Sequence, residues 1–141
     1  MDIRLLGPEH TDLVLAVEPG LFDHPPDPAQ TRAFLASPLT ELAMAFDAGR
    51  AVAFASGTVL LHPDKPPAMF VNEVGTRASH LRRGFATAVL RALIARARAR
   101  GCKGVWLGTE PDNAPACALY RRLGGEELAL VGFGWDGAFG G

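Results

Sequence analysis

Two neighbouring apolar runs constrain the fold more than any other feature of the sequence. Residues 42–47 and 50–61 are almost continuously apolar, and only a tight turn ending in Gly49 separates them. Runs of this length joined by so short a turn predict an antiparallel β-hairpin. Since nearly every position is apolar, the hairpin should be covered on both faces. An early antiparallel hairpin excludes a doubly wound Rossmann sheet and predicts a mixed sheet instead.

The other elements are predicted from hydrophobic period and from capping residues. Thr11 is a candidate cap for the first helix, Asp27 or Pro28 begins the second, and Asn113 is a good N-cap for the last. Strands are expected at 3–6, 68–76, 104–109 and 126 to about 135, and helices at 11–17, 28–37, 84–100 and 114–123. These elements form an α/β fold with a mixed, mostly antiparallel central sheet flanked by helices. The 141 residues fit one domain, with a glycine-rich tail that frays.

Composition excludes several classes of protein. With 48% hydrophobic and 21% charged residues the chain is globular rather than disordered. Cys102 and Cys117 lack the close Cys/His pairing of zinc sites, so we expect free thiols in a reducing cytoplasm and no metal. No apolar run approaches the ~18 residues of a membrane span, and the acidic start does not resemble a signal peptide.

Charge is distributed unevenly along the chain. Residues 1–75 hold 10 acidic and 4 basic side chains, whereas residues 76–141 hold 5 acidic and 10 basic ones. This asymmetry has two interpretations. It is ordinary surface charge, or the second half of the chain binds an anionic ligand and the first half binds a cation. Nucleic acid is not an expected partner, because the overall charge is −1 and no basic–aromatic interleaving is present.

The segment 79–88 links a predicted strand to a long predicted helix and contains Arg82, Arg83 and Gly84. Such a loop aims backbone N–H groups and positive side chains at one point, beside the positive end of a helix dipole, which suits a phosphate or pyrophosphate. The loop is neither Gly-x-Gly-x-x-Gly nor a Walker A loop, which argues against dinucleotides and ATP. The alternative is a plain strand-to-helix turn with surface arginines.

A second constellation lies on the last predicted helix. Asn113, Ala116 and Tyr120 stand at i, i+3 and i+7 and therefore share one face. A lone tyrosine on a helix usually belongs to an amphipathic core face, and Tyr120 is the only tyrosine in the chain.

Together these segments resemble the GNAT superfamily of acetyl-CoA-dependent N-acetyltransferases. The family loop Arg/Gln-x-x-Gly-x-Gly/Ala is matched at residues 81–86 except at Leu81, and the later Asn-x-x-Ala-x-x-x-Tyr-x-x-x-Gly pattern is matched from Asn113 to Gly124. The resemblance covers residues 68–125 well and the first 60 residues by element order. Residues 61–90 look most similar to the small aminoglycoside 3-N-acetyltransferases.

The resemblance implies acetyl-CoA as acetyl donor, with its pantetheine arm along strand 70–76 and its pyrophosphate in the 82–87 loop. A bulge in that strand would turn the Val74 N–H onto the thioester carbonyl to stabilise the oxyanion. Glu73 is the candidate base, acting through water; the alternative is a surface carboxylate or one paired with an arginine. Tyr120 is expected to stabilise the departing sulfur by a hydrogen bond. The remaining donor contacts implied are Gly75, Thr76, Arg82, Arg83, Gly84, Phe85, Ala86, Thr87, Asn113 and Ala116.

The expected function is transfer of an acetyl group to a primary amine of a small cationic acceptor, such as an aminoglycoside, by direct attack in a ternary complex. Phe22, Asp23 and His24, in a proline-rich loop, and Asn72 are the candidate acceptor contacts. Cys117 is expected to be a small apolar residue rather than a nucleophile. The alternatives are a protein or peptide amine as acceptor, or a CoA-binding module without turnover. An unpaired sheet edge near the chain end would favour a homodimer.

Overall fold

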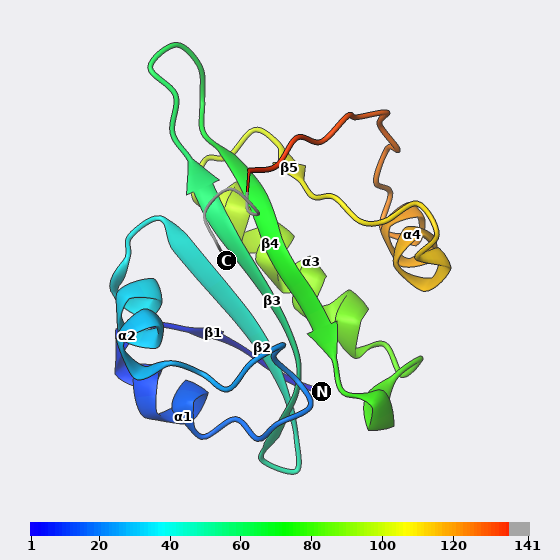
Figure 1. The fold of residues 1–141 in the computed structure, drawn as a ribbon. Helices are drawn as coiled ribbons and strands as arrows, with labels where there is room; N and C mark the ends of the chain where they lie inside the picture. The colour runs from blue at the N-terminus through cyan, green and yellow to red at the C-terminus, as the bar shows by residue number, and fades with distance from the viewer. Residues whose placement is uncertain (136–141) are drawn as a thin grey trace. The chain divides into compact units, whose positions relative to one another are not determined.

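A five-stranded sheet organises the first part of the chain in the computed structural model, which describes residues 1–135 (Figure 1). The strand order is β1-β2-β3-β4-β5, antiparallel except for the parallel pair β4–β5. This confirms the predicted mixed, mostly antiparallel sheet. The strands are β1 (Asp2–Leu6), β2 (Thr40–Asp47), β3 (Arg50–Leu60), β4 (Ala68–Thr76) and β5 (Val105–Trp106).

The predicted hairpin is β2–β3, and its turn has the backbone that a two-residue connection requires. Ala48 and Gly49 both have positive φ, 51° and 80°. Two consecutive residues of this kind match the right-handed twist of the strands that they join. Ala48 adopts the conformation without being glycine, at a conformational cost that the hairpin pairing offsets.

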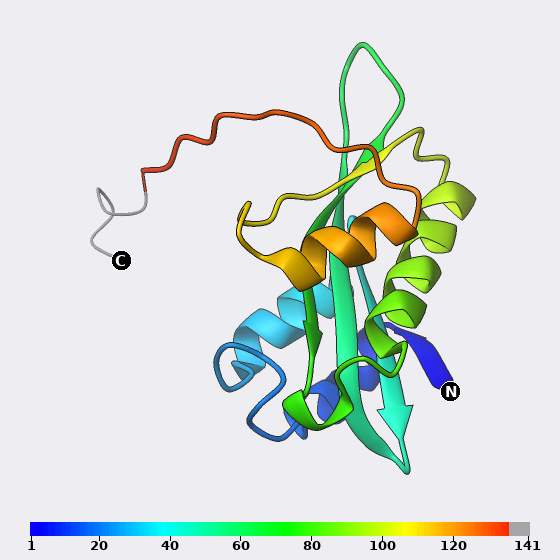
Figure 2. The same ribbon diagram turned by 90° about the vertical axis from the view of Figure 1, so that its right-hand side faces the viewer.

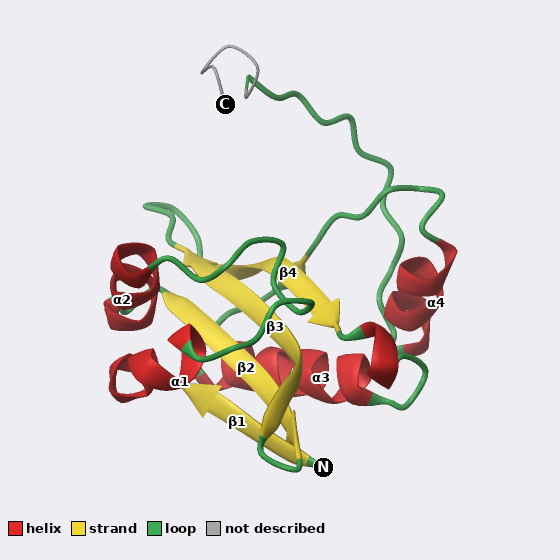
Figure 3. Cartoon of the chain, turned by 60° about the horizontal axis from the view of Figure 1, so that its bottom comes forward, coloured by secondary structure: helices red, strands yellow, loops and turns green. Residues whose placement is uncertain are grey.

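Helices cover both faces of this sheet (Figures 2 and 3). On one side lie α1 (Thr11–Leu15), which follows the 3₁₀ turn Pro8–His10, and α2 (Pro28–Ala36). On the other side lies α3 (Phe85–Ala99), reached through a second 3₁₀ turn, Ala78–His80. The prediction that the hairpin is covered on both faces is therefore confirmed.

The alternation of side chains along the hairpin explains this layering. Leu42, Met44, Phe46 and Phe54 are large and belong to the core that α1 and α2 cover, with Val14 and Leu35 contributed by those helices. The alternate positions are alanines with no exposed surface: Ala43, Ala45, Ala53 and Ala55. Because side chains alternate between faces, the alanines line the opposite face and leave room for α3 to approach closely.

The caps of the helices agree in part with expectation. The Asp27 carboxylate accepts a hydrogen bond from the Gln30 N–H at 2.8 Å and begins α2, as predicted. Thr11 is not a cap; it lies in the first turn of α1, and its hydroxyl donates to the Pro8 carbonyl at 3.0 Å. The preceding 3₁₀ turn moves the start of the helical region upstream of Thr11 and leaves its hydroxyl with another partner.

A partly buried ion cluster fastens α3 to the hairpin. Glu41, only 8% exposed, accepts from Arg96 Nε at 2.9 Å and from Arg100 Nη1 at 2.8 Å. Two guanidinium groups therefore share one carboxylate at the beginning of β2. This contact engages two of the arginines that make the second half of the sequence basic, so part of the charge asymmetry is structural.

The described chain divides into two compact units, Met1–Gly108 and a second that begins at Thr109, and each is described by itself. The second contains α4 (Ala114–Arg122), which the Asn113 side chain caps as predicted by accepting from the Ala116 N–H at 3.2 Å. That 1–141 forms a single domain stays a prediction. Among the described residues, no helix is both long and apolar enough to cross a membrane.

The strand predicted from 126 to about 135 is wrong: these residues form no strand. A strand needs a neighbour to pair its backbone N–H and C=O groups, and residues 126–135 pair with none of the described strands. The apolar pattern that predicted it is instead exposed, with Leu128, Leu130, Val131, Phe133 and Trp135 each more than 60% accessible. The strand predicted at 104–109 contracts to two residues, and the glycine-rich end, 136–141, lies outside the described residues.

Candidate functional site

A bulge in β4 is the central irregularity of the sheet. Ser56 on β3 lies opposite Glu73, but the next residue, Gly57, lies opposite Val71, so Asn72 is an extra residue on β4. This confirms the predicted bulge. The Asn72 amide exchanges hydrogen bonds with the Thr58 hydroxyl, with Nδ2 at 2.9 Å and Oδ1 at 3.1 Å from Oγ1.

The bulge places two adjacent side chains on one face. Ser56 and Thr58 are two residues apart on β3 and so point to the same side of the sheet. Glu73 lies opposite Ser56, and Asn72 bonds Thr58, so both polar residues project to that side. In a regular strand they would point in opposite directions, because successive residues alternate.

The outer edge of β4 is unpaired along most of its length. β5 pairs with β4 only at Met69 and Phe70. Beyond Phe70, within the described residues, no strand lies on that side of Val74, Gly75 and Thr76. Their outward backbone groups are available to a ligand that runs along the strand.

Gly75 has a packing role on the same strand. A Cβ added there would come within 2.7 Å of the Phe54 ring. Glycine is therefore needed because the Phe54 side chain passes directly beside the β4 backbone.

A cavity of about 300 Å³ opens on the face to which Glu73 projects. Its buried lining comes from Val14, Thr31, Leu35, Leu42, Phe54 and Ser56. Its more open lining comes from Phe22, Asp23, His24, Pro26, Gln30, Phe34 and Glu73. Phe22, Asp23, His24 and Glu73, four of the residues proposed from sequence, therefore meet at one cavity, whereas Asn72 does not line it.

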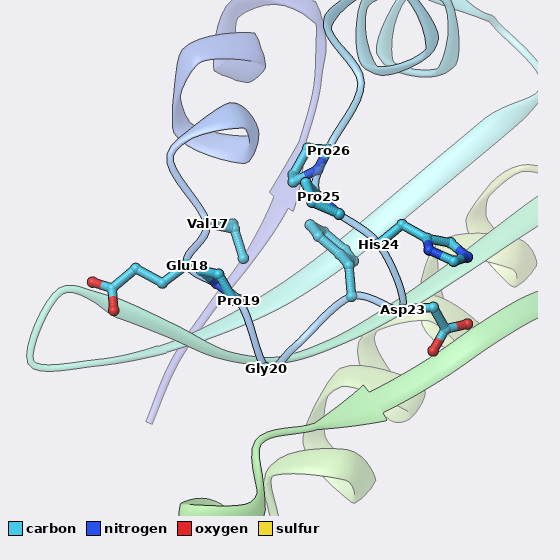
Figure 4. A pocket seen from close by; sticks show the side chains of 9 residues that line it. Val17, Glu18, Pro19, Gly20, Asp23, His24, Pro25 and Pro26 are labelled. Atoms are coloured by element: carbon cyan, nitrogen blue, oxygen red, sulfur yellow. The ribbon is translucent and has the colours of Figure 1, made fainter.

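The proline-rich loop also borders a smaller pocket of about 150 Å³, which shares Phe22, Asp23, His24 and Pro26 with the larger one (Figure 4). Asp23 and His24 project to the same side of this loop, while Glu18 points to the opposite side. Phe22 packs edge-on against Phe54, with ring centroids 4.7 Å apart. That contact anchors the loop on β3.

Arg77, immediately after β4, holds the proline-rich loop by hydrogen bonds. This role was not predicted from the sequence. Its guanidinium donates to the carbonyls of Ala51 at 2.7 Å, Pro19 at 2.7 Å and Glu18 at 2.9 Å. The side chain is 4% exposed, and this burial lowers the pKa of Arg77, helped by the nearby Arg50 charge and opposed by Glu18. Arg77 thus ties the loop that borders the cavity to the end of β4.

The loop from β4 to α3 leaves the first N–H groups of α3 without a side-chain cap. Gly84 is the N-cap residue, at φ 85°, and no side chain accepts a hydrogen bond there. The Asp27 and Asn113 side chains, in contrast, cap α2 and α4. The N–H groups of residues 85–87 therefore point outward at the positive end of the helix dipole.

Side chains around this loop add positive charge. Arg82 and Arg83 are exposed, and Arg83 lies 3.8 Å from Asp47. Asp47 is also bonded by His80 Nε2 at 2.8 Å, which joins the loop to the hairpin turn. The Phe85 ring is buried against His80, so at position 85 the backbone rather than the side chain faces outward. Leu81, in the position where the family has Arg or Gln, is 56% exposed.

On the second unit, Tyr120 is partly buried on α4. Desolvation, with a smaller contribution from Cys117, raises the pKa of the Tyr120 hydroxyl above its usual value. The phenol therefore remains protonated at neutral pH and can donate a hydrogen bond. Both cysteines are free thiols, and the described residues hold no cluster of His, Cys, Asp and Glu arranged for a metal ion.

Several lining residues were not predicted: Thr31, Gln30, Phe34, Phe54 and Ser56. Ser56 carries the clearest signal, since it is a polar residue within an otherwise apolar strand. The others look like ordinary helix or core positions in sequence. Only the packing of α2 against β2, the strand next to β3, brings them to the cavity.

Residues 8–125 match the model of the acetyltransferase (GNAT) family, a span that includes the bulged strand, the loop before α3 and α4. The chain belongs to this family and is an acetyltransferase. The matched span crosses both compact units.

Solved structures agree with this assignment. An aminoglycoside acetyltransferase from an uncultured soil metagenomic sample has a TM-score of 0.79 and 25% identity, covering 94% of this chain and 95% of its own. AAC(6')-Iy bound to a bisubstrate analogue has a TM-score of 0.78 and 24% identity, and the match covers 94% of this chain and 95% of that one. A putative acetyltransferase from Agrobacterium tumefaciens str. C58 has a TM-score of 0.77 and 24% identity, and the match covers 95% of this chain and 98% of that one. No curated protein matches the chain in sequence.

The first of these structures is named an aminoglycoside acetyltransferase. The closer likeness of residues 61–90 to the 3-N-acetyltransferases stays a prediction.

Proposed function

We propose that this protein transfers an acetyl group from acetyl-CoA to a primary amine of a small cationic acceptor, by direct attack of the amine in a ternary complex. The observation that carries the proposal is the β4 bulge. It brings the Glu73 carboxylate to a cavity beside a strand edge that has free backbone donors.

The residues present fit acetyl-CoA at two places. The uncapped N–H groups of residues 85–87, with Arg82 and Arg83 nearby, suit a pyrophosphate. The free edge of β4 at residues 74–76 suits an amide-bearing arm, which would add to the sheet like a short strand. The exposed Leu81 offers no charge, so binding rests on the backbone and on Arg82 and Arg83. The Asn113 oxygen caps α4, which leaves its amide nitrogen as the group free to meet the donor.

Glu73 is the proposed base. An alkylammonium has a pKa near ~10.4, so at neutral pH the acceptor amine must lose a proton before it attacks. No ion pair or hydrogen bond found within residues 1–135 engages the exposed Glu73 carboxylate, which leaves it free to accept that proton, directly or through water. The Ser56 hydroxyl, opposite Glu73, is placed to hold such a water.

Val74 is the proposed oxyanion donor. It follows the bulge on the unpaired edge, and its N–H would stabilise negative charge on the carbonyl oxygen as the amine attacks. The family motif proposes Tyr120 as the group that stabilises the departing sulfur. Its raised pKa favours a hydrogen bond to that sulfur over complete proton transfer.

The acceptor class is supported by two carboxylates, Asp23 and Glu73, at the cavity. An aminoglycoside is the candidate that the 25% identical structure favours, and a role in antibiotic resistance would follow from it. A protein or peptide amine and a CoA-binding module without turnover are the alternatives. We further propose one GNAT domain over residues 1–141, a cytoplasmic location in keeping with the free thiols, and a homodimer.

The test is release of free CoA thiol from acetyl-CoA in the presence of a panel of amines, peptides and aminoglycosides, together with calorimetric binding of CoA. Thiol release that depends on a small amine is the expected result. CoA binding without thiol release from any acceptor would identify a binding module, and release with peptides alone would identify a protein acetyltransferase.

A further inference from the structure

The floor of the 300 Å³ cavity is part of the hydrophobic core. Val14, Leu35, Leu42 and Phe54 come from α1, α2, β2 and β3, and each is less than 9% exposed. Phe22 and Phe34 are partly buried and pack against the same core cluster. A molecule that enters the cavity therefore meets aliphatic and aromatic side chains over most of its surface.

The polar groups of the cavity lie mainly at its exposed side. Asp23, His24, Gln30 and Glu73 are exposed, and no lysine or arginine lines the cavity. Deeper in, the polar groups are the hydroxyls of Thr31 and Ser56, both nearly buried. The charge pattern thus suits one cationic group near the opening rather than several distributed over a large ligand.

From the separation of an apolar floor from an acidic opening we infer that the acceptor is a primary amine carried on an apolar body, that is, an alkyl or arylalkyl amine. The inference rests on the proposed acetyl transfer and narrows its acceptor class from small cationic amines to apolar ones, which places such amines ahead of the aminoglycoside candidate. The ammonium group lies near Asp23 and Glu73, and the apolar body fills the floor between α1, α2 and the hairpin. A volume of about 300 Å³ is at the small end of ligand pockets, which suits a body the size of one ring or a short chain.

A polyhydroxylated acceptor fits this cavity poorly. Each of its hydroxyls that reached the floor would lose water and find an aliphatic or aromatic neighbour, and only Thr31 and Ser56 offer partners. Its further ammonium groups would find no third carboxylate in the lining.

A homologous series of amines tests the inference. The kcat/KM for acetylation of propylamine, butylamine, pentylamine and hexylamine should rise by up to about fourfold for each added methylene until the cavity is filled. Glucosamine and kanamycin, which carry primary amines on hydroxylated bodies, should be poorer substrates than hexylamine. A series that is flat in chain length, or a preference for either aminosugar, would overturn the inference.

A matched pair of variants locates the effect. Phe34→Asn replaces an apolar lining residue of α2 by a polar one and should flatten the dependence on chain length. Arg32→Gln changes an exposed residue of the same helix outside the cavity and should leave the series unchanged. Thermal unfolding of both variants checks that they fold; if Phe34→Asn does not, Phe34→Leu with phenethylamine as acceptor replaces it, and a lower kcat/KM is expected because the ring contact is lost.

Calorimetric titration of CoA-loaded protein with hexylamine and glucosamine separates this inference from the proposed function. If no amine is acetylated yet hexylamine binds more tightly, the transfer reaction is wrong and the ligand class stands. If glucosamine or kanamycin is acetylated with the higher kcat/KM, the transfer reaction stands and the apolar acceptor is wrong. Equal or weaker binding of hexylamine than of glucosamine also contradicts the apolar acceptor.

Discussion

Ser56 on β3 lies directly opposite Glu73 on β4, at the step where the register of the two strands shifts. Since opposed residues on adjacent strands project to the same face, the hydroxyl and the carboxylate enter the cavity together. The Asn72 bulge is the reason that the polar pair at 72 and 73 shares a face.

Replacing Glu73 by Gln should lower kcat by about 10²- to 10⁴-fold at neutral pH, because the variant cannot accept the ammonium proton. The deficit should shrink as pH rises toward ~10, since the free amine then becomes abundant without a base. Steady-state kinetics between pH 7 and pH 10 measure this effect. A constant deficit across that range would show that Glu73 does not act as the base.

Deleting Asn72 should restore a regular β4 ladder, because Glu73 and Val71 already lie opposite the neighbouring residues Ser56 and Gly57, and should remove the local bend that precedes Val74. We expect a folded protein that has lost about 10²- to 10³-fold in kcat, the usual contribution of one oxyanion donor. Asn72→Ala is the matched control, because it keeps the extra residue and removes only the bond to Thr58. If both variants lose activity equally, the Asn72 side chain matters rather than the bulge.

Replacing Tyr120 by Phe removes the phenolic hydroxyl and keeps the apolar ring on α4. Because burial raises the pKa of this group, its proposed role is donation of a hydrogen bond to the departing sulfur, so kcat should fall by about 10²-fold. Calorimetric affinity for acetyl-CoA should change little. An unchanged kcat removes Tyr120 from the mechanism.

Arg77→Met should lower the free energy of unfolding by about 2–4 kcal/mol, because three carbonyl acceptors lose a charged donor. Arg77→Lys should cost nearly as much, since an ammonium cannot reproduce the fork that reaches Ala51, Pro19 and Glu18 at once. Denaturant unfolding measures both. A variant as stable as the parent would mean that the loop is held by Phe22 and its contact with Phe54 instead.

Much of the fold was predictable from local patterns in the sequence. The apolar runs around Gly49, the spacing of apolar residues along α3 and the caps Asp27 and Asn113 each depend on neighbours close in the chain. The strand expected at 126–135 has the same apolar signal and does not form. A strand, unlike a helix, pairs its backbone outside its own segment, and local pattern says nothing about whether that partner is present.

The sequence by itself determined the family, through the two motifs at residues 81–86 and 113–124. It also pointed to the bulged strand and to Glu73. Only the tertiary structure decided what surrounds Glu73. The register shift at Asn72, the passage of Phe54 beside Gly75 and the packing of α2 against β2 bring an apolar floor and two carboxylates to one cavity. Those contacts join residues far apart in the chain, so their chemistry appears only when the sheet and helices pack together.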